Sequence, residues 1–324
     1  MYGRPLIYLS RANVEKVALS MQDILLLIEN AFREKAAGQV EMPPKPGIHP
    51  QANAFIHAMP AYIPALHAAG IKWVGSYPNN PQHGLPIISG LIILNDPETG
   101  IPCAVMDCTW ITAYRTGAAT ALAAKHLADP KSEVVGIIAC GVQGRTNLEA
   151  LAALFPIRRV CAYDISREVL EQYVEDIRKQ FDFEILPVDD PRKAVVDSDI
   201  IVTSVPIQKT PTPTIQKNWL KPGAFASSVD FGSCWSLEAL TQLAKVSTDD
   251  IPQFQYYRSL GYFPGFPEPY ASLDEIVSTQ KPGREDPQER IIAINLGLAM
   301  EDIAVAPEIY YRAIDMGIGT PLPL

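Results

Sequence analysis

One stretch of this sequence decides the fold, and it reads Val134-Val135-Gly136-Ile137-Ile138-Ala139-Cys140-Gly141-Val142-Gln143-Gly144-Arg145. A short apolar run here enters a turn that contains Gly141 and Gly144. Residues 146–155 continue with helical spacing, and a second apolar run ends at Asp164. This strand–turn–helix–strand order predicts a parallel βαβ unit whose glycine turn faces a dinucleotide.

The glycine turn has the residues that a dinucleotide needs. Gly141 lets the backbone of the turn, with Val142 and Gln143, approach a pyrophosphate, and Gly144 lets the helix pack closely on the strand. The helix N-terminus then points its N–H groups at the phosphates. Asp164 lies 20 positions after Gly144, and a carboxylate there suits the ribose hydroxyls of NAD but repels the 2′-phosphate of NADP. We therefore expect NAD as the cofactor.

One position departs from the usual pattern, since Ala139 stands where a first glycine commonly makes the tight turn. The flanking strand and helix still favour a bound dinucleotide over an unoccupied sheet of the same kind. Further cofactor contacts are expected at Ser204 and Val205, which end the fourth predicted strand of this sheet. Ligands of open parallel sheets bind at the carboxyl ends of strands.

Strands and helices alternate from residue 134 to residue 248, which predicts an α/β doubly wound parallel sheet. The N-terminal third has another pattern. It combines an amphipathic helix over residues 21–37 with strand-like segments, which indicates a separate domain.

The C-terminal part is expected to be helical, with helices over residues 291–304 and 307–316. The segment 256–270 is rich in tyrosine, phenylalanine and proline. It is expected to be an ordered loop with a small hydrophobic cluster of its own, and a lid or a subunit contact is the alternative.

The composition excludes several classes of partner. The chain has 324 residues with 27 basic and 36 acidic side chains, a net charge of −9, which argues against nucleic acid and anionic membranes. No apolar run approaches the roughly 20 residues of a membrane span, and residues 1–5 lack the apolar core of a signal peptide. Five cysteines without a Cys-x-x-Cys pair, and histidines without ligand spacing, predict a reduced, cytoplasmic protein without a metal site.

An ordered set of motifs runs along nearly the whole chain beside the glycine turn. They are Met59-Pro60-Ala61-Tyr62, Lys72, Val105-Met106-Asp107, Thr112-Ala113-Tyr114-Arg115-Thr116-Gly117-Ala118, Pro282-Gly283-Arg284, Leu296-Gly297-Leu298-Ala299-Met300-Glu301-Asp302 and Gly317-Ile318-Gly319-Thr320. Together they resemble the ornithine cyclodeaminase/mu-crystallin family, which also contains alanine dehydrogenases and ketimine reductases.

The resemblance implies a particular domain order. A substrate-binding and dimerisation domain of residues 1–128 and 296–324 surrounds an inserted NAD-binding Rossmann domain of residues 129–295, with the substrate site in the cleft between them. It also implies a homodimer. The few apolar N-terminal strands agree with this expectation, because unpaired sheet edges favour a partner.

The resemblance assigns substrate binding to Lys72 and Arg115, and Met59 belongs to the same set. The chemistry agrees, because the guanidinium of Arg115 offers the carboxylate of an amino or imino acid two parallel hydrogen bonds. A desolvated Lys72 can exchange a proton with the substrate nitrogen. Taken without the resemblance, each is most simply a surface or ion-pair residue.

Other positions depart from the family. Lys45 stands where members commonly carry an arginine for the substrate carboxylate. A lysine keeps the positive charge but cannot form the two parallel hydrogen bonds of a guanidinium. Cyclodeaminases place an aspartate at the position of Gly232, and Asp230 is the candidate catalytic replacement, with a local capping role or contact with the nicotinamide ribose as the alternatives. Asn295 stands near the position of a family serine beside the nicotinamide, with helix packing as its alternative role.

Three functions fit these observations. The first is an NAD-dependent oxidoreductase acting at the Cα–N bond of a small amino or imino acid, as an amino-acid dehydrogenase or ketimine reductase. The second is cyclodeamination of ornithine or a similar diamino acid with NAD recycled, and Gly232 counts against it. The third is a non-catalytic ligand-binding protein of the mu-crystallin type, which the presence of Lys72 and Arg115 disfavours.

Overall fold

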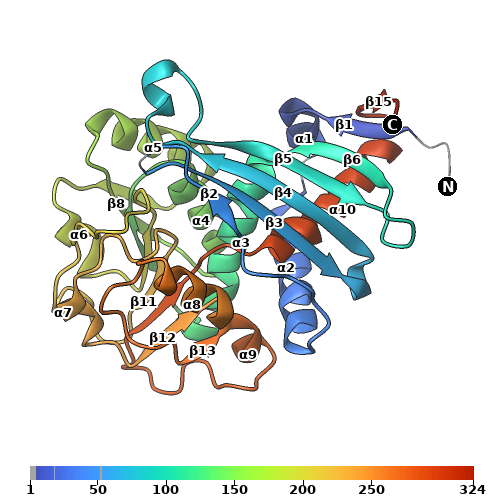
Figure 1. Cartoon of the computed structure of the whole chain (residues 1–324). Helices are drawn as coiled ribbons and strands as arrows, with labels where there is room; N and C mark the ends of the chain where they lie inside the picture. The colour runs from blue at the N-terminus through green and yellow to red at the C-terminus, as the bar shows by residue number, and fades with distance from the viewer. Residues whose placement is uncertain (1–4, 18, 52) are drawn as a thin grey trace. The chain divides into compact units, whose positions relative to one another are not determined.

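The computed structural model describes residues 5–17, 19–51 and 53–324. The chain divides into two compact units, one of residues 1–115 with 298–324 and the other of residues 116–297 (Figure 1). The first dividing point falls inside helix α3 (Thr109–Leu127), whereas the sequence placed the boundary after the end of that helix. The residues of the signal-peptide argument lie outside the described part, except Pro5.

The first unit is built on a seven-stranded sheet, in the order β15-β1-β6-β5-β4-β3-β2. Its strands are β1 (Leu6–Leu9), β2 (Gly47–Ile48), β3 (Phe55–Ile63), β4 (Ala68–Ser76), β5 (Ile88–Asn95), β6 (Pro102–Asp107) and β15 (Thr320–Leu322). All neighbours are antiparallel except β1 and β6. Alternate side chains of these strands therefore face opposite sides of the sheet.

Helices cover one face of this sheet. The helix α10 (Ala299–Asp315) contacts β3, β4 and β5, and it also packs on α1 (Arg11–Val17) and α2 (Met21–Ala36) (Figure 1). The helix α2 begins where Ser20 accepts a hydrogen bond from the backbone N–H of Asp23, an ordinary N-cap. The first half of α10 is almost completely buried, so residues there face the inner side chains of the sheet and its helical neighbours.

The second unit is a doubly wound sheet of eight parallel strands, in the order β13-β12-β14-β11-β10-β7-β8-β9. Its strands are β7 (Val134–Ile138), β8 (Arg159–Tyr163), β9 (Glu184–Pro187), β10 (Ile200–Thr203), β11 (Phe225–Ser228), β12 (Lys245–Thr248), β13 (Ala271–Ser272) and β14 (Ile291–Ile294). Its further helices are α4 (Val142–Ala152), α5 (Arg167–Gln180), α6 (Pro191–Val195), α7 (Leu237–Leu240), α8 (Ile251–Ser259) and α9 (Leu273–Val277). The predicted α/β doubly wound class is confirmed.

The C-terminal helices were predicted wrongly. Residues 291–304 do not form one helix, because Ile291–Ile294 is the buried strand β14 and α10 starts only at Ala299. A four-residue apolar run suits a buried strand as well as a buried helix. The second expected helix is also part of α10, which continues through Pro307.

The aromatic segment packs into the core of the second unit. Phe254, Phe263 and Phe266 are buried in one hydrophobic cluster with Phe231. The rings of Phe254 and Phe263 stack with centroids 4.4 Å apart. The segment is an ordered structure with a hydrophobic cluster, as the sequence predicted, although this cluster is continuous with the main core.

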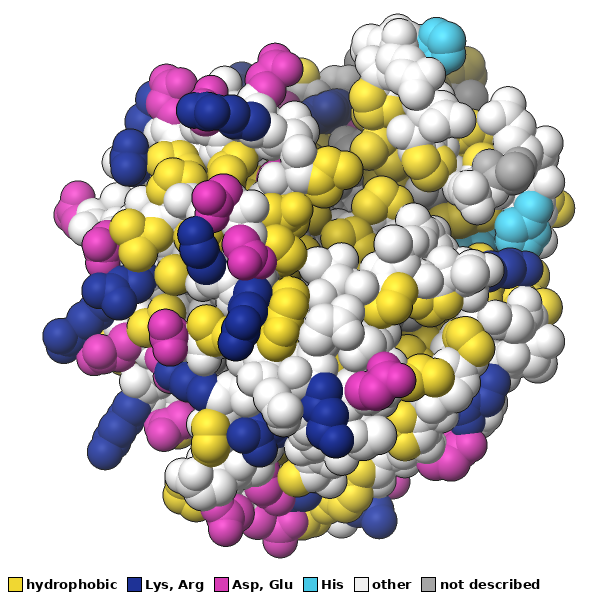
Figure 2. Space-filling model, turned by 90° about the vertical axis from the view of Figure 1, so that its left-hand side faces the viewer, with side chains coloured by type: hydrophobic (Ala, Val, Ile, Leu, Met, Phe, Trp, Pro, Cys, Tyr) yellow, Lys and Arg dark blue, Asp and Glu magenta, His cyan; other side chains and the backbone are white. Residues whose placement is uncertain are grey.

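The surface shown in Figure 2 carries lysine and arginine side chains interspersed with aspartate and glutamate, and neither sign forms a continuous patch there. Among the helices within the described residues, none combines the length and the apolar character that crossing a bilayer requires.

Candidate active site

The glycine turn begins helix α4 without a side-chain cap. Gly141 is the N-cap residue and is exposed, and no side chain hydrogen-bonds to the first N–H groups of the helix. A Cβ at Gly141 would meet no atom within 4 Å, whereas a Cβ at Gly144 would lie 2.6 Å from the carbonyl oxygen of Ala139. Gly144 is therefore needed for the packing of α4 on β7, while the space at Gly141 stays open to a ligand.

Ala139 adopts the backbone conformation that its place in the turn requires. Its φ is 76°, in the left-handed region that costs an L-residue roughly 1–2 kcal/mol. Two contacts hold it there. Its N–H donates to the carbonyl of Tyr163 (2.9 Å), and its carbonyl accepts from the hydroxyl of Ser204 (3.2 Å). Ser204 thus supports the turn from the end of β10, and Val205 beside it packs against the core cluster.

Asp164 follows β8 and is fixed beside the turn. One carboxylate oxygen accepts the backbone N–H of Cys140 (2.8 Å), and the other accepts that of Ser166 (2.8 Å). Each carboxylate oxygen can accept a second hydrogen bond. Val142 and Ile165 are apolar but highly exposed, at 62% and 89%. The turn therefore presents N–H groups, a carboxylate and exposed apolar side chains, as a dinucleotide requires.

Asn295 directly follows β14 and is 4% exposed. Its amide nitrogen donates to the hydroxyls of Thr120 (3.2 Å) and Ser227 (2.9 Å). Its side-chain oxygen is buried and has no hydrogen-bond partner among the described residues. If the amide is turned over, its oxygen accepts from those hydroxyls and its nitrogen is left over instead. Either way, one buried polar atom of Asn295 is available to a ligand.

In the first unit, Lys72 lies on the inner face of the sheet. It is 1% exposed and stands on β4 opposite Met59 of β3. Its ammonium group lies 2.5 Å from a carboxylate oxygen of Asp302 and donates to the hydroxyl of Thr112 (3.3 Å). Lys72 is therefore not the surface lysine that its sequence context alone suggested.

Arg115 binds to the same helix as Lys72 does. Its Nε donates to Asp302 (3.1 Å) and its Nη1 donates to Glu301 (2.6 Å). Both carboxylates are fully buried and both come from the first turn of α10. Asp302 thus contacts two cations, and the four side chains Lys72, Arg115, Glu301 and Asp302 form one buried cluster, which we call the α10 charge cluster.

Burial and neighbouring charges change how these groups titrate. Burial lowers the pKa of Lys72 most, the positive charge of Arg115 lowers it further, and Asp302 opposes both. Burial also disfavours the charge of Arg115, but Asp302 and Glu301 outweigh it and raise the pKa of the guanidinium. Burial raises the pKa of Glu301, with Arg115 opposing and Asp302 adding to the rise. Lys72 therefore releases its proton more readily than an exposed lysine does.

Lys45 is also buried, at 6% exposure, in the segment that precedes β2. It acts electrostatically on His57 of β3, which is 7% exposed. Burial, then the charge of Lys45 and smaller effects of His49 and Lys72, lower the pKa of His57 to about 3. His57 is thus a neutral imidazole, and no motif in the sequence indicates that it lies near these lysines.

Asp230 has a different environment in the second unit. It is fully buried, and its carboxylate accepts from the hydroxyl of Ser228 (2.5 Å) and the thiol of Cys234 (3.3 Å). The Ser228 hydroxyl also accepts the backbone N–H of Gly232 (2.8 Å). Ser228 and Cys234 flank Asp230 in the chain, and Thr203 of the neighbouring strand β10 also hydrogen-bonds to it. These neutral partners favour the structural role over the catalytic one.

Gly232 has no room for a side chain. Its φ is 69°, and a Cβ there would lie 2.1 Å from the ring of Phe266. Phe266 is itself buried in the core cluster. An aspartate at position 232 would therefore require the aromatic core to move.

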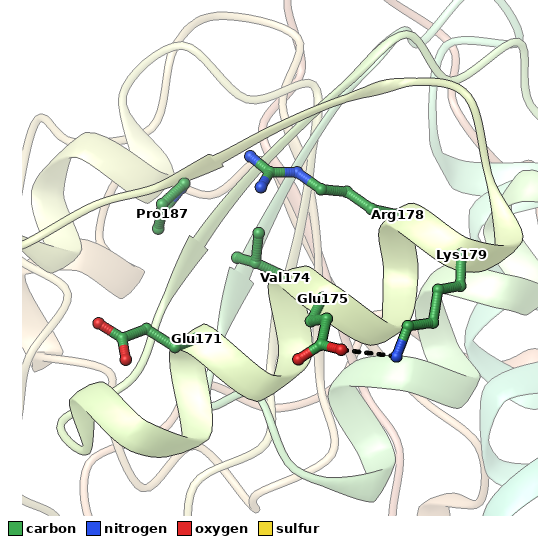
Figure 3. Close-up of a pocket in the computed structure, with 6 residues that line it drawn as sticks. All are labelled: Glu171, Val174, Glu175, Arg178, Lys179 and Pro187. Carbon is green, nitrogen blue, oxygen red and sulfur yellow. Dashed lines mark hydrogen bonds and ion pairs between the residues drawn. The ribbon is translucent and has the colours of Figure 1, made fainter.

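The hollow drawn in Figure 3 lies along α5 beside Pro187 of β9, and it is lined by Glu171, Val174, Glu175, Arg178, Lys179 and Pro187. The ammonium of Lys179 lies 2.7 Å from Glu175, and both side chains are more than 60% exposed. Such exposed ion pairs contribute little, and none of the site residues above lines the hollow. It carries no candidate site.

The described residues also contain no group of three or more His, Cys, Asp or Glu side chains that could hold a metal ion.

The comparisons with known proteins agree with this arrangement. The family model of the ornithine cyclodeaminase/mu-crystallin family matches residues 7–317. The chain belongs to this family. An alanine dehydrogenase of Archaeoglobus fulgidus is 34% identical, with 97% of each chain covered.

Two solved structures extend the likeness to the whole fold. The Δ1-pyrroline-2-carboxylate reductase of Thermococcus litoralis, in complex with NADH and L-proline, is 32% identical with a TM-score of 0.89, covering 98% of this chain and 100% of that one. An archaeal alanine dehydrogenase dimer with bound NAD is also 32% identical, with a TM-score of 0.86 and coverage of 98% and 99%. These family members are oxidoreductases of amino and imino acids.

Proposed function

We propose that this protein is an NAD-dependent oxidoreductase that acts at the Cα–N bond of a small amino or imino acid. The main observation in its favour is the buried pair of cations, Lys72 and Arg115, in a chain that also has a glycine turn at the start of α4. Similar relatives are an alanine dehydrogenase and a pyrroline-2-carboxylate reductase, which use this chemistry on small substrates.

The residues of the second unit fit NAD. The uncapped N-terminus of α4 suits the pyrophosphate, and Gly141 leaves space for its approach. Asp164 suits the free ribose hydroxyls of NAD and disfavours NADP. The unpartnered polar atom of Asn295 suits the carboxamide of the nicotinamide. Solved relatives contain NAD or NADH.

Two residues of the first unit are assigned to the substrate. Arg115 is assigned to its carboxylate. The hydrogen bonds of Arg115 to Asp302 and Glu301 use two of the five N–H groups of a guanidinium, which leaves further donors for the substrate. Lys72 exchanges a proton with the substrate nitrogen, and its lowered pKa suits that role. Bound NADH supplies the hydride for Cα of an imine, or NAD accepts it from an amine. Lys45 adds positive charge, and Met59 forms part of the buried face beside Lys72.

Cyclodeamination is the alternative, and two local features disfavour it. The position of the cyclodeaminase aspartate is Gly232, where Phe266 occupies the space of a side chain. Asp230, the candidate replacement, already has hydrogen bonds to both carboxylate oxygens within its own turn. A diamino acid would bring a distal ammonium without a partner, which is costly in a desolvated site.

The test is a panel of substrates read by two signals. L-Alanine, L-proline and other amino acids are supplied with NAD, and cyclic imines or keto acids with ammonia or methylamine are supplied with NADH. We expect stoichiometric change in NADH, with tighter binding of NADH than of NADPH. L-Ornithine with catalytic NAD is the opposing arm. Stoichiometric proline and ammonia without accumulated NADH would contradict the proposal, and a ligand bound without turnover would favour the mu-crystallin alternative.

We also propose a homodimer formed through the outer face of the first unit's sheet. This face is opposite to the one that α10 covers. It carries apolar side chains from five strands, which are Tyr8, Tyr62, Ile71, Trp73, Leu91, Ile93 and Val105. Trp73 and Leu91 are 46% and 41% exposed and lie opposite each other. A contiguous apolar face of this kind marks an interface, and a similar alanine dehydrogenase is a dimer.

Light scattering tests this assembly. We expect twice the 35.5 kDa of the chain at micromolar concentration, and a mass of one chain for Trp73→Glu. A wild-type mass of one chain would contradict the proposal.

We place the protein in the cytoplasm, because the cysteines are free thiols and four of the five are buried.

A further inference from the structure

The α10 charge cluster is unusual in its connectivity. The carboxylate of Asp302 contacts Lys72 of β4 through one oxygen and Arg115 of α3 through the other. The adjacent Glu301 contacts Arg115 and the backbone of Leu298, and within the described residues no ion pair joins it to Lys72. All four side chains are at most 7% exposed. One carboxylate thus fixes the relative position of the two cations that the proposed function assigns to the substrate.

We propose that Asp302 is a positioning residue of the reaction, which holds the ammonium of Lys72 and the guanidinium of Arg115 in one fixed relation. Glu301 serves Arg115 only. This inference rests on the proposed function of Lys72 and Arg115.

Stability alone gives a poor account of this cluster. Burying an ion costs several kcal/mol, and replacing a buried set of ion pairs by apolar side chains is often neutral or stabilising. The residues directly opposite Lys72 on the two neighbouring strands, Met59 and Ile92, are buried and apolar. An apolar side chain at each of the four positions would suit that core. The charges therefore serve a purpose beyond folding.

The surroundings of Lys72 single out Asp302 as the opposing charge. Thr112 and Arg115 reach it from α3, and Cys108 acts on it from just before that helix. His57 of β3 is electrostatically coupled to it and is neutral. Among the causes of the pKa of Lys72, burial and Arg115 lower it, and Asp302 is the largest that raises it. Removing the charge of Asp302 therefore lowers the pKa of Lys72 further.

The arrangement has a consequence for the reaction. In the reductive direction, a hydride adds to Cα of the imine and a proton from Lys72 adds to its nitrogen. The C=N bond becomes CH–NH, and the imine gains no net charge because one negative and one positive ion of hydrogen are added. Lys72 donates that proton only while it is protonated. Asp302 extends the pH range of donation upward, and it keeps the donor at a set distance from the guanidinium that binds the carboxylate.

The central variant is Asp302→Asn, measured in the full-length protein with Δ1-pyrroline-2-carboxylate and NADH. We expect the alkaline limb of the kcat profile to move toward acid, because Asp302 raises the pKa of Lys72. A shift of about one pH unit would be a tenfold change in the protonation equilibrium of Lys72. Glu301→Gln is the matched variant, because Glu301 pairs with Arg115 and not with Lys72. It should raise KM several-fold and leave the limb in place. Equal limb shifts in both variants, or none in Asp302→Asn, would overturn the proposal.

Asp302→Glu separates charge from position. It keeps the carboxylate and moves its oxygens, so we expect the wild-type limb with a lowered kcat, and a wild-type kcat would contradict positioning. It also carries the test if Asp302→Asn does not fold. Asp199→Asn is the control in the second unit, where Asp199 pairs with Lys221 and caps two backbone N–H groups. It should lower stability and leave the limb unchanged.

A measurement without substrate distinguishes this inference from the proposed function. Because the pKa of folded Lys72 lies below the ordinary 10.5, the unfolded chain binds more protons in the interval between the two values, and stability rises with pH there. In Asp302→Asn this rise should begin at a lower pH, and it should disappear in Lys72→Met. If stability rises at a lower pH in Asp302→Asn but no substrate of the panel is turned over, the coupling between Asp302 and Lys72 stands and the proposed function is refuted. An unchanged rise would refute the coupling whatever the enzyme does.

Discussion

Asp302 and Asp230 are both fully buried carboxylates, and they differ in everything that surrounds them. Asp302 faces two cations that come from a strand and a helix far away in the sequence. Asp230 faces two hydroxyls and a thiol, which come from Ser228 and Cys234 close to it in the chain and from Thr203 of β10. The first carboxylate is held by charged groups, and the second by neutral hydrogen bonds.

The difference separates chemistry from architecture. The two cations of the α10 charge cluster are balanced by two carboxylates, but Arg115 has further N–H groups that these carboxylates do not use, and an anionic ligand in a buried region gains strongly from them. A carboxylate with neutral donors has no such surplus, and burial raises the pKa of Asp230 although Ser228 and Cys234 oppose the rise. We therefore expect changes in the α10 charge cluster to affect turnover, and changes around Asp230 to affect stability.

The largest expected effect is that of Lys72→Ala. We expect kcat to fall about 10²-fold to 10⁴-fold, the usual contribution of a positioned proton donor. The measurement is steady-state turnover of the identified substrate over a range of pH, with NADH binding by fluorescence as the control. NADH binding should persist, because the dinucleotide turn lies in the other unit. If kcat remained near that of the wild type, the α10 charge cluster would have only a structural role, as we expect for Asp230, and the contrast between the two carboxylates would be wrong.

The next effect concerns Gly232→Ala in the turn of Asp230. The left-handed φ and the ring of Phe266 together predict a loss of about 2–4 kcal/mol in the free energy of unfolding. Chemical denaturation measures this loss. Combining the change with Phe266→Leu should recover part of it, because the two residues share one space.

Turnover per folded molecule of Gly232→Ala should stay within about threefold of the wild type, a difference below 1 kcal/mol. A large fall in kcat with normal stability would instead place this turn at the reacting centre.

Features that depend on local contacts could be predicted from the sequence, and features that depend on contacts between distant segments could not. The glycine turn, Asp164 and the doubly wound class were predictable because their signals lie within one βαβ unit. Lys72 and Arg115 were found through the family resemblance, and no periodicity distinguishes them from surface residues. Their partners on α10 were not recognised, since that contact exists only after three separate segments have folded together.

Local signals also failed where they were ambiguous. The run Ile291–Ile294 has no polar residue to define a period, so the sequence predicts a helix where the chain forms the strand β14. Pro307 suggested a break in a helix that in fact continues through it. Burial of α10 against the sheet and α2 outweighs the loss of one backbone hydrogen bond.

The smallest effect is expected for Asp230→Asn, and its sign depends on pH. The folded pKa of Asp230 is raised above the ordinary 3.8, so the folded protein binds more protons than the unfolded chain as pH rises from that value. Wild-type stability therefore declines with rising pH until the folded carboxyl has also ionised. Asparagine does not ionise, so the variant loses this decline.

The variant should accordingly be slightly less stable than the wild type in acid, because its NH2 group replaces an oxygen that accepts from Ser228 or Cys234. It should gain stability relative to the wild type toward neutral pH. Denaturation at a series of pH values measures the difference, and Asp302→Asn provides the contrast because its partners are cations. A stability difference that is independent of pH would mean that Asp230 is ionised at no extra cost. The two buried aspartates would then differ less than their neighbours indicate, and a catalytic carboxylate at position 230 would again deserve a test.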